Sequence, residues 1–275
     1  MGQPITEELL ILTKTYPSPS ATNRETTCVA AINRQGEMRR LFPVPYRLLE
    51  GAAQFKKWEW ITARLTKPTK DHRPESFRLD ADSILRSGNI IKTTGGDWSE
   101  RLCWIQSHIV ESFAALEARR QASGQTLGFL RATRIIELQI TPVKQTDWTE
   151  ADKIKLSQDG LFDTHEVKSR PPLRKLPFDF HYCYECATPT GVETNIHKLV
   201  DWEVGALFWN CTQGYGSRWE EKFRQKLEAD FARKDLFFLM GTIHRFPDQW
   251  LIVGIVYPPK PPQVRAEQLG LTLGQ

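Results

Sequence analysis

The segment KDHRPES, residues 70–76, gathers charged side chains around a proline. Pro74 disfavours the α conformation at Arg73, so we expect an extended loop from which Asp71, Arg73 and Glu75 project alternately. Two carboxylates beside one guanidinium can orient it toward a phosphate or the edge of a base. The segment therefore predicts a loop that binds an anionic ligand.

Other basic residues stand near the ends of predicted strands rather than on exposed helices. Neighbours on a strand point to opposite faces, so one of Arg39 and Arg40 must face a core or a cleft. A guanidinium there needs a carboxylate, a phosphate or carbonyl groups as partners. Two interpretations stay open: a phosphate-binding surface, or internal ion pairs with nearby acids. The residues predicted to bind nucleic acid are Lys14, Arg39, Arg40, Arg47, Lys56, Lys57, Asp71, Arg73 and Glu75.

The motif HKLVDWE contains a second cluster. On a helix, His197 and Asp201 would share one face, as an acid–base pair or two metal ligands would, while Glu203 would point elsewhere. Cys183 and Cys186 together with His197 imitate three zinc ligands. Three alternatives stay open: a catalytic set of His197, Asp201 and Glu203, a zinc site, and a structural His–Asp hydrogen bond. We expect the structural role and no cofactor.

The elements that must position these residues are mostly short strands. Apolar alternation and turn residues predict strands at 8–16, 26–33, 38–42, 58–66, 178–186, 235–246 and 250–259. Helical patterns are expected at 46–54, 97–109, 111–123, 149–158, 195–211 and 218–234. Trp58 and Trp60 share one strand face and are expected in the core, with stacking on a base as the alternative. Strands and helices do not alternate and no Gly-rich phosphate loop is visible, so we expect an α+β protein rather than a doubly wound nucleotide-binding sheet.

Composition narrows the class of protein. The 275 residues are 40% hydrophobic and carry a formal net charge of +4, which permits a polyanionic partner without requiring one. No apolar run is long enough to cross a membrane, and the acidic start is unlike a signal peptide. Five cysteines without an export signal are expected to be reduced thiols. We expect a cytoplasmic protein that does not bind membranes.

A stretch rich in Pro, Lys and Arg at 167–177 divides the predicted elements. Residues 1–166 are expected to form a β-rich domain with inserted helices. Residues 167–275 are expected to form an α+β domain with two helices and a C-terminal β-hairpin. Two alternatives stay open: this domain is separate from the first, or it is continuous with it.

Almost the whole chain resembles an uncharacterised family of bacterial proteins through its motifs LFPVPYR, DHRPES and HKLVDWE. The order of strand, short helix, strand and charged loop in the first half also resembles PUA-like barrels, the group that contains ASCH and EVE modules. Those folds often bind RNA or modified bases in a cleft. The resemblance implies a PUA-like barrel in the N-terminal half, with an α+β extension packed across it.

Together these features predict a protein that binds RNA or DNA, single-stranded or modified, rather than an enzyme. The family resemblance suggests an accessory role in bacterial defence or a mobile element. Two alternatives stay open: an enzyme that processes nucleic acid or nucleotides with His197, Asp201 and Glu203, or a subunit that binds a protein partner in a larger complex.

Overall fold

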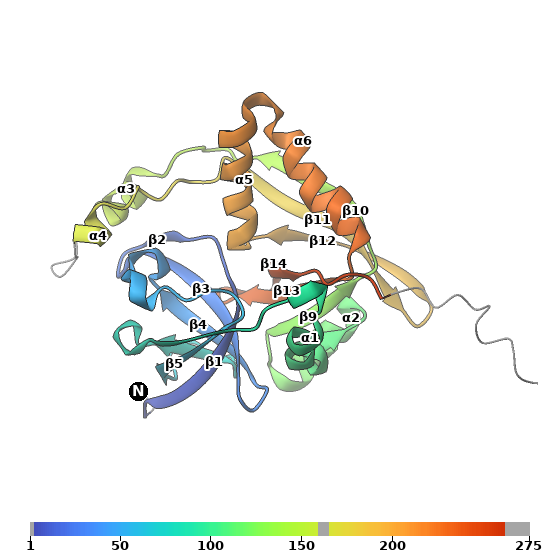
Figure 1. The fold of residues 1–275 in the computed structure, drawn as a ribbon, viewed down its shortest axis with the longest axis horizontal. Helices are drawn as coiled ribbons and strands as arrows, with labels where there is room; N and C mark the ends of the chain where they lie inside the picture. Colours follow the sequence, from blue (N-terminus) through green and yellow to red (C-terminus); the bar gives the residue numbers. More distant parts are fainter. Residues whose placement is uncertain (1–2, 159–164, 262–275) are drawn as a thin grey trace, which may run out of the picture.

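The computed structural model describes residues 3–158 and 165–261 (Figure 1). Two seven-stranded sheets form its framework. The strands of the first sheet are β1 (Ile5–Lys14), β2 (Ser18–Ser20), β3 (Arg24–Asn33), β4 (Met38–Val44), β5 (Glu59–Thr66), β6 (Ser76–Leu79) and β7 (Leu85–Ile90). Those of the second are β8 (Ile109–Val110), β9 (Leu127–Ala132), β10 (Arg134–Pro142), β11 (Phe178–Thr188), β12 (Gly191–Leu199), β13 (Leu236–Ile243) and β14 (Phe246–Val256).

The first sheet closes into a barrel. Its strand order is β1-β3-β4-β6-β5-β7, and β1 also pairs with β5, which completes a ring of five strands. The ring pairs are antiparallel except β4 and β6, which run parallel with Arg40 opposite Ser76. The KDHRPES segment leads into β6 and therefore reaches the barrel wall beside β4. An α+β protein with a barrel in its N-terminal half is thus confirmed.

Strand β1 is buried on both faces, which explains its continuous apolar run. Leu9 and Ile11 point into the barrel, where they pack with Val29 of β3. Leu10 and Leu12 point outward and pack with residues of the second sheet. Successive side chains of a strand lie on opposite faces, so β1 contributes to both cores.

The second sheet has the order β10-β11-β12-β14-β13-β9-β8. Its strands β9, β13 and β14 supply the residues that pack against the outside of the barrel, among them Phe129, Leu239 and Val253. Together with Leu10 and Leu12 they form a shared core between the two sheets. Burial of this apolar surface is what holds the two sheets together.

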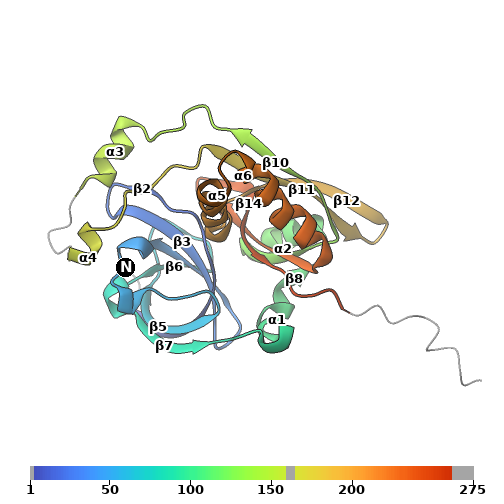
Figure 2. The same cartoon turned by 45° about the horizontal axis from the view of Figure 1, so that its top comes forward.

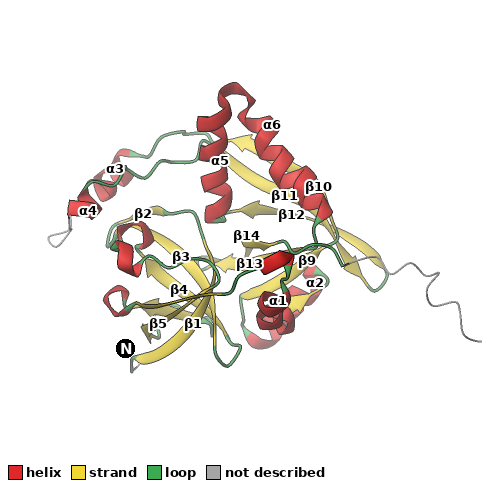
Figure 3. Ribbon diagram, in the orientation of Figure 1, coloured by secondary structure: helices red, strands yellow, loops and turns green. Residues whose placement is uncertain are grey.

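Six α-helices are described around these sheets: α1 (Ser99–Ile105), α2 (Phe113–Ser123), α3 (Glu150–Leu156), α4 (His165–Lys168), α5 (Trp202–Tyr215) and α6 (Trp219–Arg224). Helices α5 and α6 cover β11 and neighbouring strands, as Figure 3 shows. Phe208 and Phe223 pack there against Phe180. Helix α3 lies beside β2 of the barrel in both Figure 1 and Figure 2.

The expected helix over 195–211 is wrong at its start. Residues up to Leu199 belong to strand β12, whose partner is β11, and α5 begins only at Trp202. The apolar positions Ile196 and Leu199 matched a helical stripe but lie on opposite faces of this strand: Ile196 is exposed and Leu199 is buried. The expected short helix over 46–54 consists of two 3-10 turns, Tyr46–Leu48 and Gly51–Ala53.

The change from the first sheet to the second falls between Ile90 and Ile109. Strands β8, β9 and β10 lie within the expected 1–166 unit, yet they pair in the second sheet. The domain division at 166 and 167 stays a prediction. Within residues 3–158 and 165–261, no helix has the length and apolar character that crossing a membrane demands.

Candidate ligand cavity between the barrel and the second sheet

A cavity of about 750 Å³ lies where the barrel meets the hairpin of β13 and β14. The barrel lines it with residues of β4, β6 and the KDHRPES loop, and the second sheet adds residues 242–245. A volume of this size suits a ligand of several tens of atoms, such as a nucleotide. The basic side chains that line it are Arg40, Lys70, Arg73, Arg78 and Arg245, and the acidic one among the described residues is Asp71.

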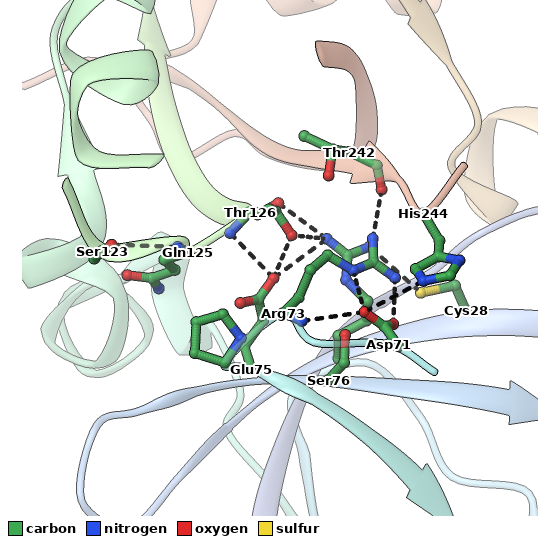
Figure 4. A network of polar contacts seen from close by, with 12 residues as sticks. Cys28, Asp71, Arg73, Glu75, Ser76, Ser123, Gln125, Thr126, Thr242 and His244 are labelled. Carbon is green, nitrogen blue, oxygen red and sulfur yellow. Dashed lines mark hydrogen bonds and ion pairs between the residues drawn. The ribbon is translucent and has the colours of Figure 1, made fainter. Parts of the chain in front are cut away.

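Arg73 forms one wall of the cavity and is held rigidly (Figure 4). Its Nε and Nη2 donate to the two carboxylate oxygens of Asp71 at 2.9 and 2.6 Å. Its Nη1 donates to the backbone carbonyl of Thr242 at 2.9 Å. Burial tends to raise the pKa of Asp71, but the hydrogen bonds from Arg73 outweigh it and lower that pKa to about 2. The pair is therefore ionised, and it joins the barrel loop to β13.

Arg40 lies deeper, with 4% of its surface exposed. Its Nη2 donates to the carbonyl and the hydroxyl oxygen of Thr126 at 2.9 and 3.0 Å. Glu75 lies 3.6 Å from the same nitrogen and also accepts from the Thr126 backbone N–H at 3.1 Å. Gly241 permits this arrangement, because a Cβ there would lie 3.3 Å from Arg40 Nη2. The second acid of the KDHRPES segment thus neutralises a barrel arginine and is hydrogen-bonded to Thr126, the residue before β9.

The outer part of the cavity carries unpaired positive charge. Lys70, Arg78 and Arg245 are exposed, and none of them forms an ion pair with a described residue. His244 donates from Nε2 to the Lys70 carbonyl at 3.0 Å and so holds the hairpin against the loop. The rim is therefore cationic, whereas Arg40 and Arg73 deeper inside are each balanced by a carboxylate.

An aromatic ring also lines the cavity. Phe42 of β4 is 50% exposed, although large aromatic side chains are usually buried. Phe77 of β6 lines the same cavity but is only 7% exposed. Phe42 can therefore present a ring face to a ligand.

Only some of the residues expected from sequence meet here. Arg40, Asp71 and Arg73 line the cavity and Glu75 lies behind Arg40. Arg39 points the other way: its Nε and Nη2 donate to Glu7 at 2.8 Å each. Neighbouring positions of β4 face opposite sides, so the strand sends one arginine to the cavity and the other to an internal ion pair.

Arg47 and the three lysines lie elsewhere. Arg47 donates to Glu25 at 2.9 Å and to the carbonyl of Pro171. Lys14 lies 4.3 Å from the centre of the Tyr46 ring, and burial lowers its pKa to about 8. Lys57 donates to Glu203 at 2.8 Å and to the Ile255 carbonyl at 3.0 Å. Lys56 is exposed and does not line the cavity. The nine expected residues therefore do not gather into one pocket.

His197, Asp201 and Glu203 do not form an acid–base set. Asp201 caps α5 by accepting from the Glu203 backbone N–H at 2.7 Å, and it also accepts from the Ile255 N–H at 3.1 Å. His197 lies on β12 and its Nδ1 is hydrogen-bonded to the Tyr184 hydroxyl at 2.9 Å. The helical spacing that suggested a His–Asp pair is absent, because a strand end and a helix cap separate the two side chains.

Burial shifts both of these groups. It raises the pKa of Asp201 to about 6 and lowers the pKa of His197 to about 4. The Cys183 and Cys186 side chains alternate across β11, with Cys186 buried in the core. The described part of the chain holds no group of three His, Cys, Asp or Glu side chains that could bind a metal.

Sequence reasoning missed several cavity residues. Lys70 is the first residue of the KDHRPES motif and Arg78 follows it by two residues, so both could have been chosen for that reason; Phe42 lies within the LFPVPYR motif. Thr242, His244 and Arg245 carry no sequence signal of their own. They reach the cavity only because β13 and β14 pack beside the barrel.

The fold and the cavity define an α+β protein with a closed barrel, a second sheet and a basic pocket at their junction. Residues 109–272, more than half of the chain, match the model of the domain of unknown function DUF8757, and the chain belongs to this family. Residues 5–107 match a further domain of unknown function, DUF8758. The two matched segments meet where the chain passes from the first sheet to the second.

Comparison with curated proteins found no match. Among solved structures, one similar chain belongs to a replication protein A heterotrimer bound to ssDNA. It is 9% identical, and the match covers 93% of this chain and 66% of that one, with a TM-score of 0.24. The match therefore spans slightly less than two thirds of that chain. A TM-score this low does not establish a common fold.

Proposed function

We propose that the protein binds single-stranded nucleic acid at the cavity between the barrel and the second sheet. The observation that carries this proposal is the separation of charge in the cavity. Lys70, Arg78 and Arg245 are unpaired at the rim within the described chain, while the inner arginines are neutralised by Asp71 and Glu75. A phosphate backbone at the rim with a base inside would match both zones.

The rim suits phosphates because its cations come from three separate segments. Lys70 belongs to the barrel loop, Arg78 to β6 and Arg245 to the turn between β13 and β14. Exposed cations that are not paired with carboxylates can neutralise successive phosphates and release their counterions. The binding affinity should therefore fall as the salt concentration rises.

Phe42 supports a single strand over a duplex. A half-exposed ring at a cavity can stack on an unpaired base, and such stacking accepts any base because every base has a π-face. Bases in a duplex are already stacked on each other. An accessory role in bacterial defence or a mobile element stays a prediction.

The test is a titration of a fluorescently labelled oligonucleotide at several salt concentrations. We expect the logarithm of the affinity to fall linearly with the logarithm of the salt concentration, with a slope of about −2 for three phosphate contacts. The double variant Arg78→Ala with Arg245→Ala should weaken binding and reduce that slope by about 1.4. Arg233→Ala is the matched control, since Arg233 is exposed and does not line the cavity.

Two results would reject the proposal. One is the absence of binding to single-stranded DNA and RNA at low salt. The other is equal loss of affinity in the rim variant and in Arg233→Ala, which would place the contact outside the cavity.

A further inference from the structure

The inner end of the cavity has polar groups without partners, and they differ in kind from the rim. Thr242 is 4% exposed, yet its hydroxyl has no hydrogen-bond partner among the described residues. Arg40 Nε likewise has none, and Arg40 Nη1 has only the Cys28 sulfur at 3.9 Å. Buried polar groups are nearly always hydrogen-bonded in the functional state of a protein, so these groups mark a place for a ligand.

These groups favour an acceptor on the ligand. A guanidinium can only donate hydrogen bonds, and the Thr242 hydroxyl can donate one. Among the acceptor-only groups that line this end, the Thr242 carbonyl accepts from Arg73, and both Asp71 oxygens accept from the same guanidinium. The Ser76 hydroxyl also lines the cavity without a partner and can donate or accept, while the unpartnered Oε2 belongs to Glu75, which does not line the cavity. The free groups of Arg40 can only donate, so a ligand that enters this end meets an excess of donors among the lining residues.

The same region is close to electrically neutral. Arg40 is accompanied by Glu75, and Arg73 by Asp71. A phosphate placed here would meet no excess positive charge, unlike at the rim, and would lose its hydration. A neutral group that presents carbonyl oxygens fits the donors without that cost.

We propose that the Arg40 and Thr242 side chains select a keto base, guanine or thymine/uracil, over adenine in the strand that the cavity binds. The proposal rests on the function proposed above and adds base specificity to it. Guanine presents the O6 and N7 acceptors that arginine contacts most often, and thymine and uracil present carbonyl oxygens. On the edge where guanine presents two acceptors, adenine presents the N7 acceptor beside the N6 amino donor, so it leaves one donor unmatched.

The neighbours of Arg40 hold its guanidinium in a position from which it can donate to a base. Thr126 fixes Nη2 and Gly241 leaves room for the guanidinium, since an added Cβ would meet Nη1 at 3.4 Å. A donor that is held before the ligand arrives loses little freedom on binding. Thr242 sits next to Gly241 on β13, so both contacts belong to one rigid strand.

The experiment compares oligonucleotides of about eight residues that are all adenine, or adenine with one central guanine or thymine. Both DNA and RNA versions are titrated by fluorescence anisotropy with the full chain. We expect the guanine and thymine strands to bind about tenfold more tightly than the all-adenine strand. Thr242→Val keeps the shape of the side chain, removes the hydroxyl and should reduce this preference to about threefold or less.

The rim variant Arg78→Ala is the matched control, and it should weaken all strands by the same factor and leave the preference unchanged. Arg40→Lys is a second variant and should also lose the base preference. Its melting temperature shows whether it folds. If it does not fold, the base preference of Thr242→Val alone decides the test. Salt-dependent binding without any base preference would overturn this inference and leave the proposed function standing. No binding to any strand would overturn both.

Discussion

The guanidinium of Arg73 joins the two halves of the molecule by donating to the carbonyl of Thr242 at 2.9 Å (Figure 4). The two residues are far apart in the chain, one in the barrel loop and the other on β13. Arg73 is in turn fixed by both oxygens of Asp71. The charged loop therefore connects the barrel to the second sheet and also lines the cavity.

Arg73→Ala should lower the free energy of unfolding by about 1 to 3 kcal/mol, because it leaves the half-buried Asp71 carboxylate and the Thr242 carbonyl without their donor. Chemical denaturation measures this. Arg64→Ala is the control: Arg64 also donates two hydrogen bonds to an aspartate, both to Oδ2 of Asp80, but the two side chains are 58% and 40% exposed. Its loss should stay under about 0.5 kcal/mol. Equal losses in the two variants would show that burial of the Arg73 pair adds nothing.

Gly241→Ala should destabilise the protein by about 1 to 2 kcal/mol, because the new methyl group would lie 3.1 Å from Leu127 and 3.3 Å from Arg40. Thermal and chemical unfolding both measure the change. Gly214→Ala provides the contrast, since nothing lies within 4 Å of its Cβ position on α5. That variant should gain about 0.5 to 1 kcal/mol from helix propensity. A neutral Gly241→Ala would mean that the arginine moves aside freely.

Phe42→Ala should weaken binding of single-stranded oligonucleotides by about 1 to 3 kcal/mol, since one stacked base would be lost. The melting temperature should change little, because half of the ring is already exposed. Leu85→Ala is a control on the exposed barrel surface and should leave affinity unchanged. Unchanged affinity in Phe42→Ala would remove the stacking contact from the proposed function.

His197 predicts a dependence of stability on pH. Burial lowers its pKa from the ordinary 6.5 to about 4, so the unfolded chain binds a proton in this interval and the folded chain does not. The contribution of His197 to stability should therefore fall as the pH falls from about 6.5 to about 4, by up to about 3 kcal/mol. Asp201, whose pKa is raised to about 6, contributes in the opposite direction below that pH, so the effect of His197 is read from a comparison with a variant. Denaturant unfolding across this pH range measures the effect.

The variant His197→Gln isolates this contribution. Glutamine can keep a hydrogen bond to Tyr184 but does not titrate. The difference in unfolding free energy between the two proteins should change across the interval and be constant above it. Parallel curves for both proteins would show that His197 is accessible to protons in the folded state.

Local sequence patterns determined seven of the fourteen described strands and the class of fold. The β1 run and the hairpin of β13 and β14 were readable because burial on both faces requires continuous apolar residues. The apolar pattern wrongly predicted a helix at Ile196 and Leu199, because their spacing also fits one face of a helix. Pairing with β11 decided their state, and a partner strand is not visible in a local window.

The sequence by itself also determined that Arg39 and Arg40 point in opposite directions, since alternation follows from strand geometry. It did not determine which one reaches a cavity. Glu7 and Thr126 are distant in the chain, and only the closure of the barrel and its packing on β9 place them beside their arginines. Arg245 joins the rim for the same reason. Charge type and strand direction are local properties, whereas the partner of each charge depends on contacts between distant segments.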